Sequence, residues 1–170
     1  TEKLTGTTDS NVTATAKTYK GYTHDTQNVS RVESGVVNGD GSLTLKVYYK
    51  VNKHSIKYTV TGTVPAGAPS APKEKTDVAY STTQKVENTL TKEGYTFTGW
   101  STKDAQVNAG EFAMPDKDVE FTGSWQANSN TKYKVEHYKE DADNLGKYKL
   151  ADTEKLTGTT DSNVTATAKT

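Results

Sequence analysis

Apolar and polar residues alternate along several short stretches of this chain, a period that is typical of half-buried β-strands. The clearest stretch runs from Leu43 to Val51, and its apolar positions are Leu43, Leu45, Val47, Tyr49 and Val51. Residues 38–41, NGDG, directly precede it and have the composition of a tight turn. The pattern therefore predicts an antiparallel hairpin that pairs residues 28–37 with residues 43–51.

The same pattern predicts further elements. A second hairpin is expected to pair residues 132–140 with residues 147–152 across residues 141–146. Additional strands are expected at residues 56–64, 95–100 and 119–125. One helical turn is expected near residues 10–17, where Asp9 or Ser10 can cap and where Val12 and Ala16 are four residues apart.

Repetition dominates the organisation of the chain. Residues 153–170 repeat residues 1–18 letter for letter, as TEKLTGTTDSNVTATAKT. Shorter patterns also return, because KYTV at residues 57–60 reappears as KYKV at 132–135 and GYT at 21–23 reappears at 94–96. We interpret the chain as a window from a tandem array built of two related modules of roughly 75 residues each. Such arrays favour length or multivalency over a catalytic pocket.

The repeats predict three segments. Residues 1–52 are interpreted as the latter part of one module, residues 53–128 as a complete second module, and residues 129–170 as the first part of the next copy of the first module. The hairpin at 132–152 is the element that the N-terminal segment lacks. We therefore predict head-to-tail or swapped association, in which the C-terminal segment of one chain completes the N-terminal segment of another chain or of itself.

Composition narrows the expected partners and cofactors. The chain has 21 basic and 21 acidic residues and a formal net charge of zero, so no field favours nucleic acid or an anionic membrane surface. It has no apolar run long enough to cross a bilayer, so no membrane insertion is expected. Cysteine is absent, which excludes disulfides and thiolate metal sites. No cofactor is predicted.

No motif indicates catalysis. His24, His54 and His137 are scattered, and no paired-histidine metal motif, serine nucleophile motif or phosphate-binding glycine loop is present. The sequence therefore predicts no catalytic, cofactor or metal residues and a protein that is not an enzyme. No spacing identifies the lysine, asparagine and acid of an isopeptide crosslink.

Residues 141–146 partly resemble a calcium-binding loop. Asp141, Asp143 and Gly146 stand at its first, third and sixth places and Asp152 at the twelfth. However, Leu145 occupies the fifth place and strands are expected on both sides. A hairpin turn is the favoured interpretation, and calcium is the alternative.

The aromatic residues have two possible roles. Their rings could stack on sugars or fill the core, and the core is favoured because the chain has few other large apolar residues; the rings concerned are Tyr95, Phe97, Trp100, Phe121 and Trp125. Tyr48 and Tyr138 are expected to point outward and are the candidate ligand-contact residues.

Two sets of motifs resemble families of bacterial surface repeats. YKVEHY at 133–138, with residues 149–154, 157–168, 19–22 and 47–51, resembles the mucin-binding-protein (MucBP) type repeats of Gram-positive surface proteins. GYTFTGW at 94–100, with residues 114–119 and 121–125, resembles the Listeria-Bacteroides repeat, akin to internalin B-repeats and streptococcal tandem-repeat stalk domains. Together these motifs span nearly the whole chain.

The resemblance implies a fold, a location and a role. It implies small β-grasp or ubiquitin-like α+β modules, β-rich, with a mainly antiparallel sheet and short helical segments. It also implies an extracellular position in a wall-anchored adhesin, with neighbouring copies of the repeat as partners. The expected function is a stalk that extends a distal binding domain from the cell, and the alternative is a weak multivalent module that binds host mucin or another glycan.

Overall fold

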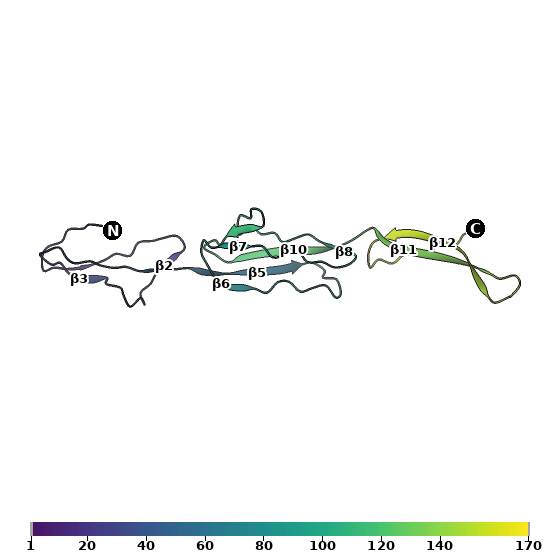
Figure 1. Ribbon diagram of the computed structural model, residues 1–170, viewed down its shortest axis with the longest axis horizontal. Coiled ribbons are helices and arrows are strands. Elements are labelled where there is room, and N and C mark those ends of the chain that lie inside the picture. The colour runs from purple at the N-terminus through teal and green to yellow at the C-terminus, as the bar shows by residue number, and fades with distance from the viewer. Residues whose placement is uncertain (1, 170) are drawn as a thin grey trace. The chain divides into compact units, whose positions relative to one another are not determined.

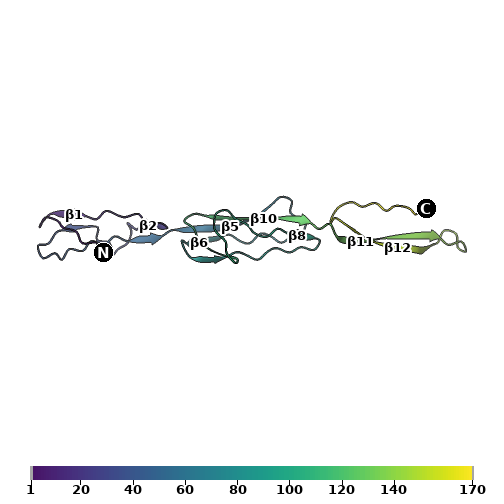
Figure 2. The ribbon, with the colours of Figure 1, turned by 90° about the horizontal axis from the view of Figure 1, so that it is seen from above.

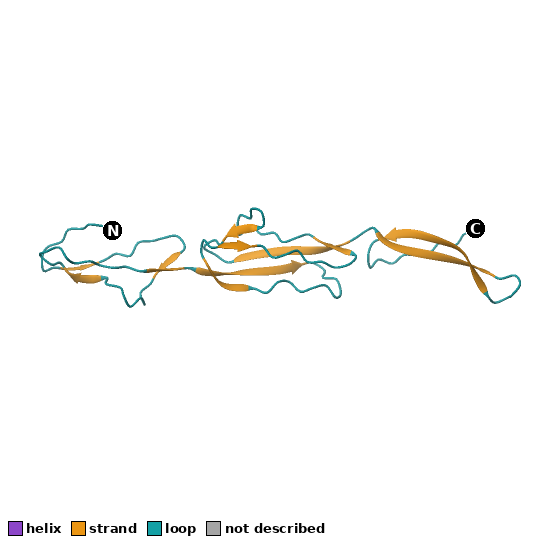
Figure 3. Ribbon diagram, in the orientation of Figure 1, coloured by secondary structure: helices purple, strands orange, loops and turns teal. Residues whose placement is uncertain are grey.

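The computed structural model describes residues 2–169, and strands are its only regular elements (Figure 3). No helix is present in these residues. The expected α+β modules of the β-grasp or ubiquitin-like type, with short helical segments, are therefore wrong, and the fold is all-β.

The predicted helical turn at residues 10–17 shows why helices do not form. Asn11–Thr13 is strand β1, and Asp9 just before it has a φ of 64°. The Ser10 hydroxyl does not cap a helix but donates to the carbonyl of Thr7 at 2.6 Å, which closes a turn. Valine and threonine are β-branched and lose rotamer freedom in a helix, so this segment takes an extended form.

The chain forms two compact units that interleave in sequence. The first comprises residues 1–57, 73–86 and 102–120, and the second comprises residues 58–72, 87–101 and 121–170. The predicted boundaries at 52/53 and 128/129 divide the sequence into repeat modules, whereas the compact units are defined by contacts in space. The module boundaries therefore stay a prediction.

The first unit contains three two-stranded sheets, all antiparallel. Strand β1 pairs with β3, β2 with β4, and β7 with β9. In the same unit β6 pairs with the start of β5. The strands are β2 (Tyr22–His24), β3 (Ser34–Val36), β4 (Tyr49–Val51), β5 (Lys53–Thr61), β6 (Lys75–Ala79), β7 (Thr83–Lys85) and β9 (Glu111–Ala113).

The first predicted hairpin forms only in part. Tyr49–Val51 is a strand, but its partner is β2 and not residues 28–37. Between the two predicted arms a single bridge remains, Val32 to Lys46. Alternation identifies which side chains share a face, but a strand also needs a continuous hydrogen-bonded neighbour, and residues 43–48 do not have one.

The second unit contains the longest hairpin (Figures 1 and 2). Strand β11 (Thr131–Glu140) pairs antiparallel with β12 (Tyr148–Gly158), with an irregularity between His137 and Tyr138. The prediction of this hairpin is confirmed, although β12 continues further than expected.

The two remaining strands, β8 and β10, form a four-stranded sheet together with β5 and β6. Strand β8 (Tyr95–Phe97) pairs antiparallel with the end of β10 (Val119–Ala127), and the sheet order is β6-β5-β10-β8. The predicted strands at 56–64, 95–100 and 119–125 correspond to β5, β8 and β10 with shifted ends.

Buried apolar side chains occur only in residues 53–128 of the described chain. In the first unit they are Ile56, Phe112, Met114 and Val119, and in the second Tyr58, Phe97 and Phe121. Tyr58 stacks on Phe121 with ring centroids 5.1 Å apart, and the half-buried Trp100 and Trp125 pack edge-on against Phe97 at 4.8 and 4.9 Å. These contacts favour the core interpretation of the aromatic rings.

Exposed apolar side chains show the opposite distribution. Apart from Val64, every large hydrophobic residue that is exposed lies in residues 2–52 or 129–169. Leu4 is 85% exposed, Leu145 81% and Tyr148 65%. The N-terminal and C-terminal segments therefore have strands but no buried apolar core.

No helix in the described part of the chain is long and apolar enough to cross a membrane.

Candidate functional site: a polar clasp and a repeated latch

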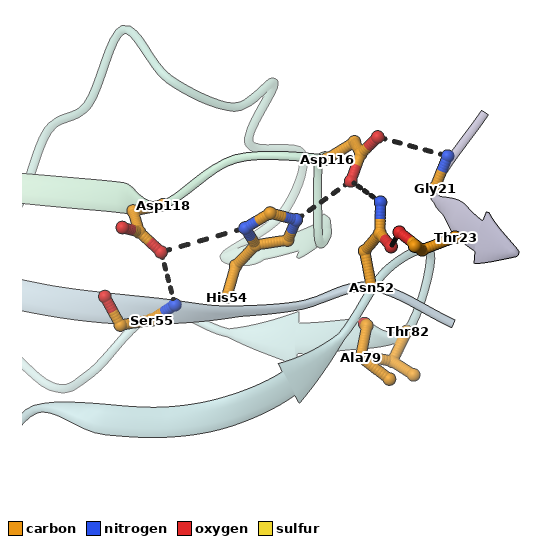
Figure 4. A network of polar contacts seen from close by, with 9 residues as sticks. All are labelled: Gly21, Thr23, Asn52, His54, Ser55, Ala79, Thr82, Asp116 and Asp118. Carbon is orange, nitrogen blue, oxygen red and sulfur yellow. Dashed lines mark hydrogen bonds and ion pairs between the residues drawn. The ribbon is translucent and has the colours of Figure 1, made fainter. Parts of the chain in front are cut away.

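The carboxylate of Asp116 joins three segments of the first unit (Figure 4). Its Oδ1 accepts hydrogen bonds from Asn52 Nδ2 at 2.8 Å and from His54 Nε2 at 2.9 Å. Its Oδ2 accepts a hydrogen bond from the backbone N–H of Gly21 at 3.1 Å. We call these three bonds the Asp116 clasp.

The strand order places each member of the clasp. Gly21 immediately precedes β2, Asn52 lies between β4 and β5, and His54 is in β5. Asp118 accepts the N–H of Ser55 at 2.7 Å and lies 3.8 Å from His54 Nδ1, so carboxylates face both ring nitrogens of this histidine.

Every polar group of Asn52 makes a hydrogen bond. Its Nδ2 bond to Asp116 belongs to the clasp, and we call its three remaining bonds the Asn52 latch. Its N–H donates to Gly21 O at 2.8 Å, and its carbonyl accepts Tyr80 N–H at 2.9 Å. Its side-chain Oδ1 accepts the Thr23 hydroxyl at 2.6 Å. The single residue between β4 and β5 thereby binds two further parts of the chain.

Glycine is required at position 21. Its φ is 77°, and a Cβ at this position would lie 1.9 Å from Cδ1 of Tyr80. The absence of a side chain lets the Tyr80 ring cover the backbone while the N–H still reaches Asp116.

Hydrogen bonding determines the protonation of the clasp. The hydrogen bond from Asn52 lowers the pKa of Asp116 most, followed by the one from His54, while desolvation opposes them. The carboxylate is therefore ionised at neutral pH, and it already accepts three hydrogen bonds. This arrangement holds chain segments together through charge-assisted hydrogen bonds.

The second unit contains the same latch at another place. Asn128 N–H donates to Gly94 O at 2.9 Å, and the Asn128 carbonyl accepts Thr160 N–H at 2.9 Å. The Asn128 Oδ1 accepts the Thr96 hydroxyl at 2.7 Å. Gly94 has a φ of 77°, the value found at Gly21. We call this the Asn128 latch.

The two latches differ in their acidic partner. Among residues 2–169, neither the N–H of Gly94 nor the Nδ2 of Asn128 has a hydrogen-bond partner, whereas Asp116 binds the equivalent groups of the Asn52 latch. In the second unit the Tyr95 hydroxyl instead donates to Asp161. The Asn128 latch therefore has two unused donors.

The loop that partly resembles a calcium site is a hairpin turn. The Asp141 carboxylate accepts Asp143 N–H at 3.2 Å and Asn144 Nδ2 at 3.3 Å, and it pairs with the Lys149 ammonium at 2.7 Å. An ammonium group thus occupies the position a cation would need. The described residues contain no group of three side chains able to hold a metal ion.

The predicted contact tyrosines lie in different units. Tyr138 is 53% exposed, and its hydroxyl donates to Glu136 Oε2 at 2.7 Å, a hydrogen bond that raises the pKa of Tyr138. Tyr48 is half-buried, and its carbonyl accepts Asp25 N–H at 2.8 Å.

The sequence pattern did not identify the clasp. The recurring GYT motif contains the two latch glycines. No sequence pattern distinguishes their partners Asn52 and Asn128 from the many other asparagines of the chain. An asparagine directly follows each strand that pairs with a GYT strand, β4 and β10, but the sequence does not reveal this pairing.

Comparison of the chain with protein-family models, curated proteins and solved structures finds no match.

Proposed function

We propose that this chain is a structural repeat unit of a cell-wall-attached bacterial surface adhesin, and that the array extends a distal binding domain away from the cell. The observation that carries this proposal is the latch, which recurs at Asn52 and Asn128 with the same three hydrogen bonds. A joint repeated along a chain suits a load-bearing array better than a site for chemistry.

Three features add support. The duplicated 18-residue segment is expected of an array of near-identical copies. A net charge of zero together with many threonines suits a soluble extracellular surface. The motifs that resemble MucBP and Listeria-Bacteroides repeats favour a Gram-positive surface protein, in which neighbouring copies would be the partners.

The alternative is a weak multivalent module for host mucin or another glycan. The exposed Tyr138 ring on β11 favours it, because a ring face can stack on a sugar and an array would multiply a weak site.

A glycan and mucin array experiment separates the two functions. One in-phase repeat and a tandem of several repeats are compared on the same array. We expect no sugar-selective signal from either protein. A selective signal that rises with copy number, and that Tyr138→Ala removes, would contradict the structural role and establish the alternative.

A further inference from the structure

The two copies of the duplicated segment have different strand partners. Residues 11–13 form β1 and pair with β3, whereas the identical residues 163–165 belong to no strand. Conversely, residues 154–158 belong to β12 and pair with β11, whereas the identical residues 2–6 belong to no strand. Leu156 is 38% exposed and its counterpart Leu4 85%. Each copy therefore has one of two partners and lacks the other.

The central segment contains an equivalent turn whose two flanking strands both have partners. A turn at residues 79–82 follows β6, which pairs with β5, and precedes β7, which pairs with β9. The turns at 7–10 and 159–162 are equivalent to it. In each, the third residue has positive φ (Asp9 64°, Ser81 65°, Asp161 57°) and the fourth donates its hydroxyl to the carbonyl of the first (Ser10 to Thr7, Thr82 to Ala79, Ser162 to Thr159).

Strand β11 has one edge without a neighbouring strand, and comparison with β5 in the central segment shows which strand would lie there. In the four-stranded sheet β5 has a neighbour on each side, β6 and β10, whereas β11 has only β12. Residues 43–51 correspond to β10, because each ends in a pairing with the GYT strand and is followed directly by the latch asparagine. All nine residues of β10 are strand, but only Tyr49–Val51 of residues 43–51.

We propose that residues 131–165 of one chain complete residues 19–52 of a second copy of this chain. Strand β11 of the donor then lies beside residues 43–51 of the acceptor, as β5 lies beside β10. Donor residues 163–165 replace the acceptor's own β1 and pair with its β3 in the same register, so that Asn163 faces Val36 and Thr165 faces Ser34. This interaction concerns assembly and goes beyond the structural role proposed above.

The exchange has a clear driving force. Donor residues 163–165 have the same sequence as β1 and make the same pairing with β3, so the replacement itself costs little free energy. The gain is burial of apolar surface that is now exposed or half-buried on both partners, including Leu150 on the hairpin and Leu43 and Leu45 on the acceptor.

The unused donors of the Asn128 latch supply a second contact. Asp40 stands three residues before Leu43, as Asp116 stands three residues before Val119. In the completed assembly Asp40 of the acceptor takes the position of Asp116 and accepts the N–H of Gly94 and the Nδ2 of Asn128 from the donor.

Disulfide trapping in the full chain tests the register, since the protein has no cysteine of its own. The Thr13–Ser34 pair lies between the bonds Ala14 N–H to Glu33 O and Val37 N–H to Ser10 O, so it is a non-hydrogen-bonded pair. Such pairs have Cα atoms about 4.5 Å apart, which a disulfide can span. Chains carrying S34C alone and T165C alone are mixed in a glutathione redox buffer.

We expect a covalent dimer of the S34C and T165C chains, and we expect its loss when A166C replaces T165C, because a shift of one residue points the side chain to the other face. Equal trapping by T165C and A166C, or no trapping by either, would overturn the proposal. So would a doubly substituted S34C/T165C chain that forms only an internal bond, since the donor would then complete its own chain.

A locked variant provides an independent readout. The T13C/S34C chain, once oxidised, holds its own β1 on β3 and cannot accept a donor. We expect light scattering to show concentration-dependent association of the unsubstituted chain and its loss in the oxidised variant, with recovery on reduction. Association that is unaffected by the lock would contradict strand exchange.

Discussion

Single residues at the latches combine backbone and side-chain requirements. Gly21 needs positive φ and also needs room for the Tyr80 ring, whereas Gly110 has a φ of 78° with no atom within 4 Å of a Cβ. The two glycines therefore separate conformational strain from a steric clash.

We predict that Gly110→Ala costs about 1–2 kcal/mol of unfolding free energy, the ordinary penalty of positive φ. Gly21→Ala should cost more, because the Tyr80 ring must also move and Gly21 N–H loses its position against Asp116. Chemical denaturation of both variants measures the difference. Equal costs would show that the contact with Tyr80 does not matter.

The clasp carboxylate gives a pH-dependent contribution to stability. The pKa of Asp116 is lower in the folded state than its ordinary value of 3.8. Its contribution is therefore complete above that value and is lost as the pH falls through the folded pKa.

We predict that Asp116→Asn lowers the unfolding temperature at neutral pH and leaves a smaller loss of stability between about pH 5 and pH 2 than the unsubstituted chain shows. Thermal unfolding across this range is the measurement. Asp77→Asn is the control, because Asp77 has an exposed side chain and lies 3.7 Å from Lys53, outside the latch. If Asp77→Asn reduces the loss of stability at low pH as much as Asp116→Asn does, the clasp is not the cause of the pH dependence.

At the scale of elements, equivalent strands differ in what surrounds them. Phe121 on β10 is 0% exposed and stacks on Tyr58, while Leu45, at the corresponding position of residues 43–51, is half-buried. The difference in burial follows from the presence or absence of a neighbouring strand.

We predict that Phe121→Ala destabilises the chain by about 3–5 kcal/mol. Leu45→Ala should cost about 1 kcal/mol in dilute protein, since less apolar surface is removed from water. Urea unfolding at low and high protein concentration measures both. The cost of Leu45→Ala should rise at high concentration if a second copy covers this face, and a constant cost would argue against that cover.

How far the sequence predicts this fold depends on whether the partner of each strand is local. The hairpin of β11 and β12 was predictable, because its turn and both arms are contiguous. The strand at 43–51 was predicted in full but forms only at Tyr49–Val51, because alternation does not reveal a missing neighbour. The helical turn at 10–17 was wrong, because threonine and valine favoured pairing with β3.

The clasp was less predictable than the strands. Asp116 lies 62 residues or more from His54, Asn52 and Gly21 in the sequence, and no local motif connects them. Only the structure shows that the asparagine after each GYT-paired strand binds the next part of the chain.

At the scale of the whole molecule, the buried core is confined to residues 53–128 of the described chain. We predict that limited proteolysis of dilute protein removes the flanking segments first and leaves a resistant fragment of about this extent. Mass spectrometry of the digest identifies the fragment. Cleavage that begins inside β5 or β10 would contradict the prediction.

The latch also bears on how the gene can change. Its contact with the following segment is made by the main-chain N–H of residue 80 or 160, which is tyrosine in one case and threonine in the other. Because the bond does not depend on that side chain, unequal recombination can add or delete whole copies without matching new side chains at each boundary. The backbone bonds of the joint need only a glycine with positive φ at residue 21 or 94 and the main chain of residue 52 or 128.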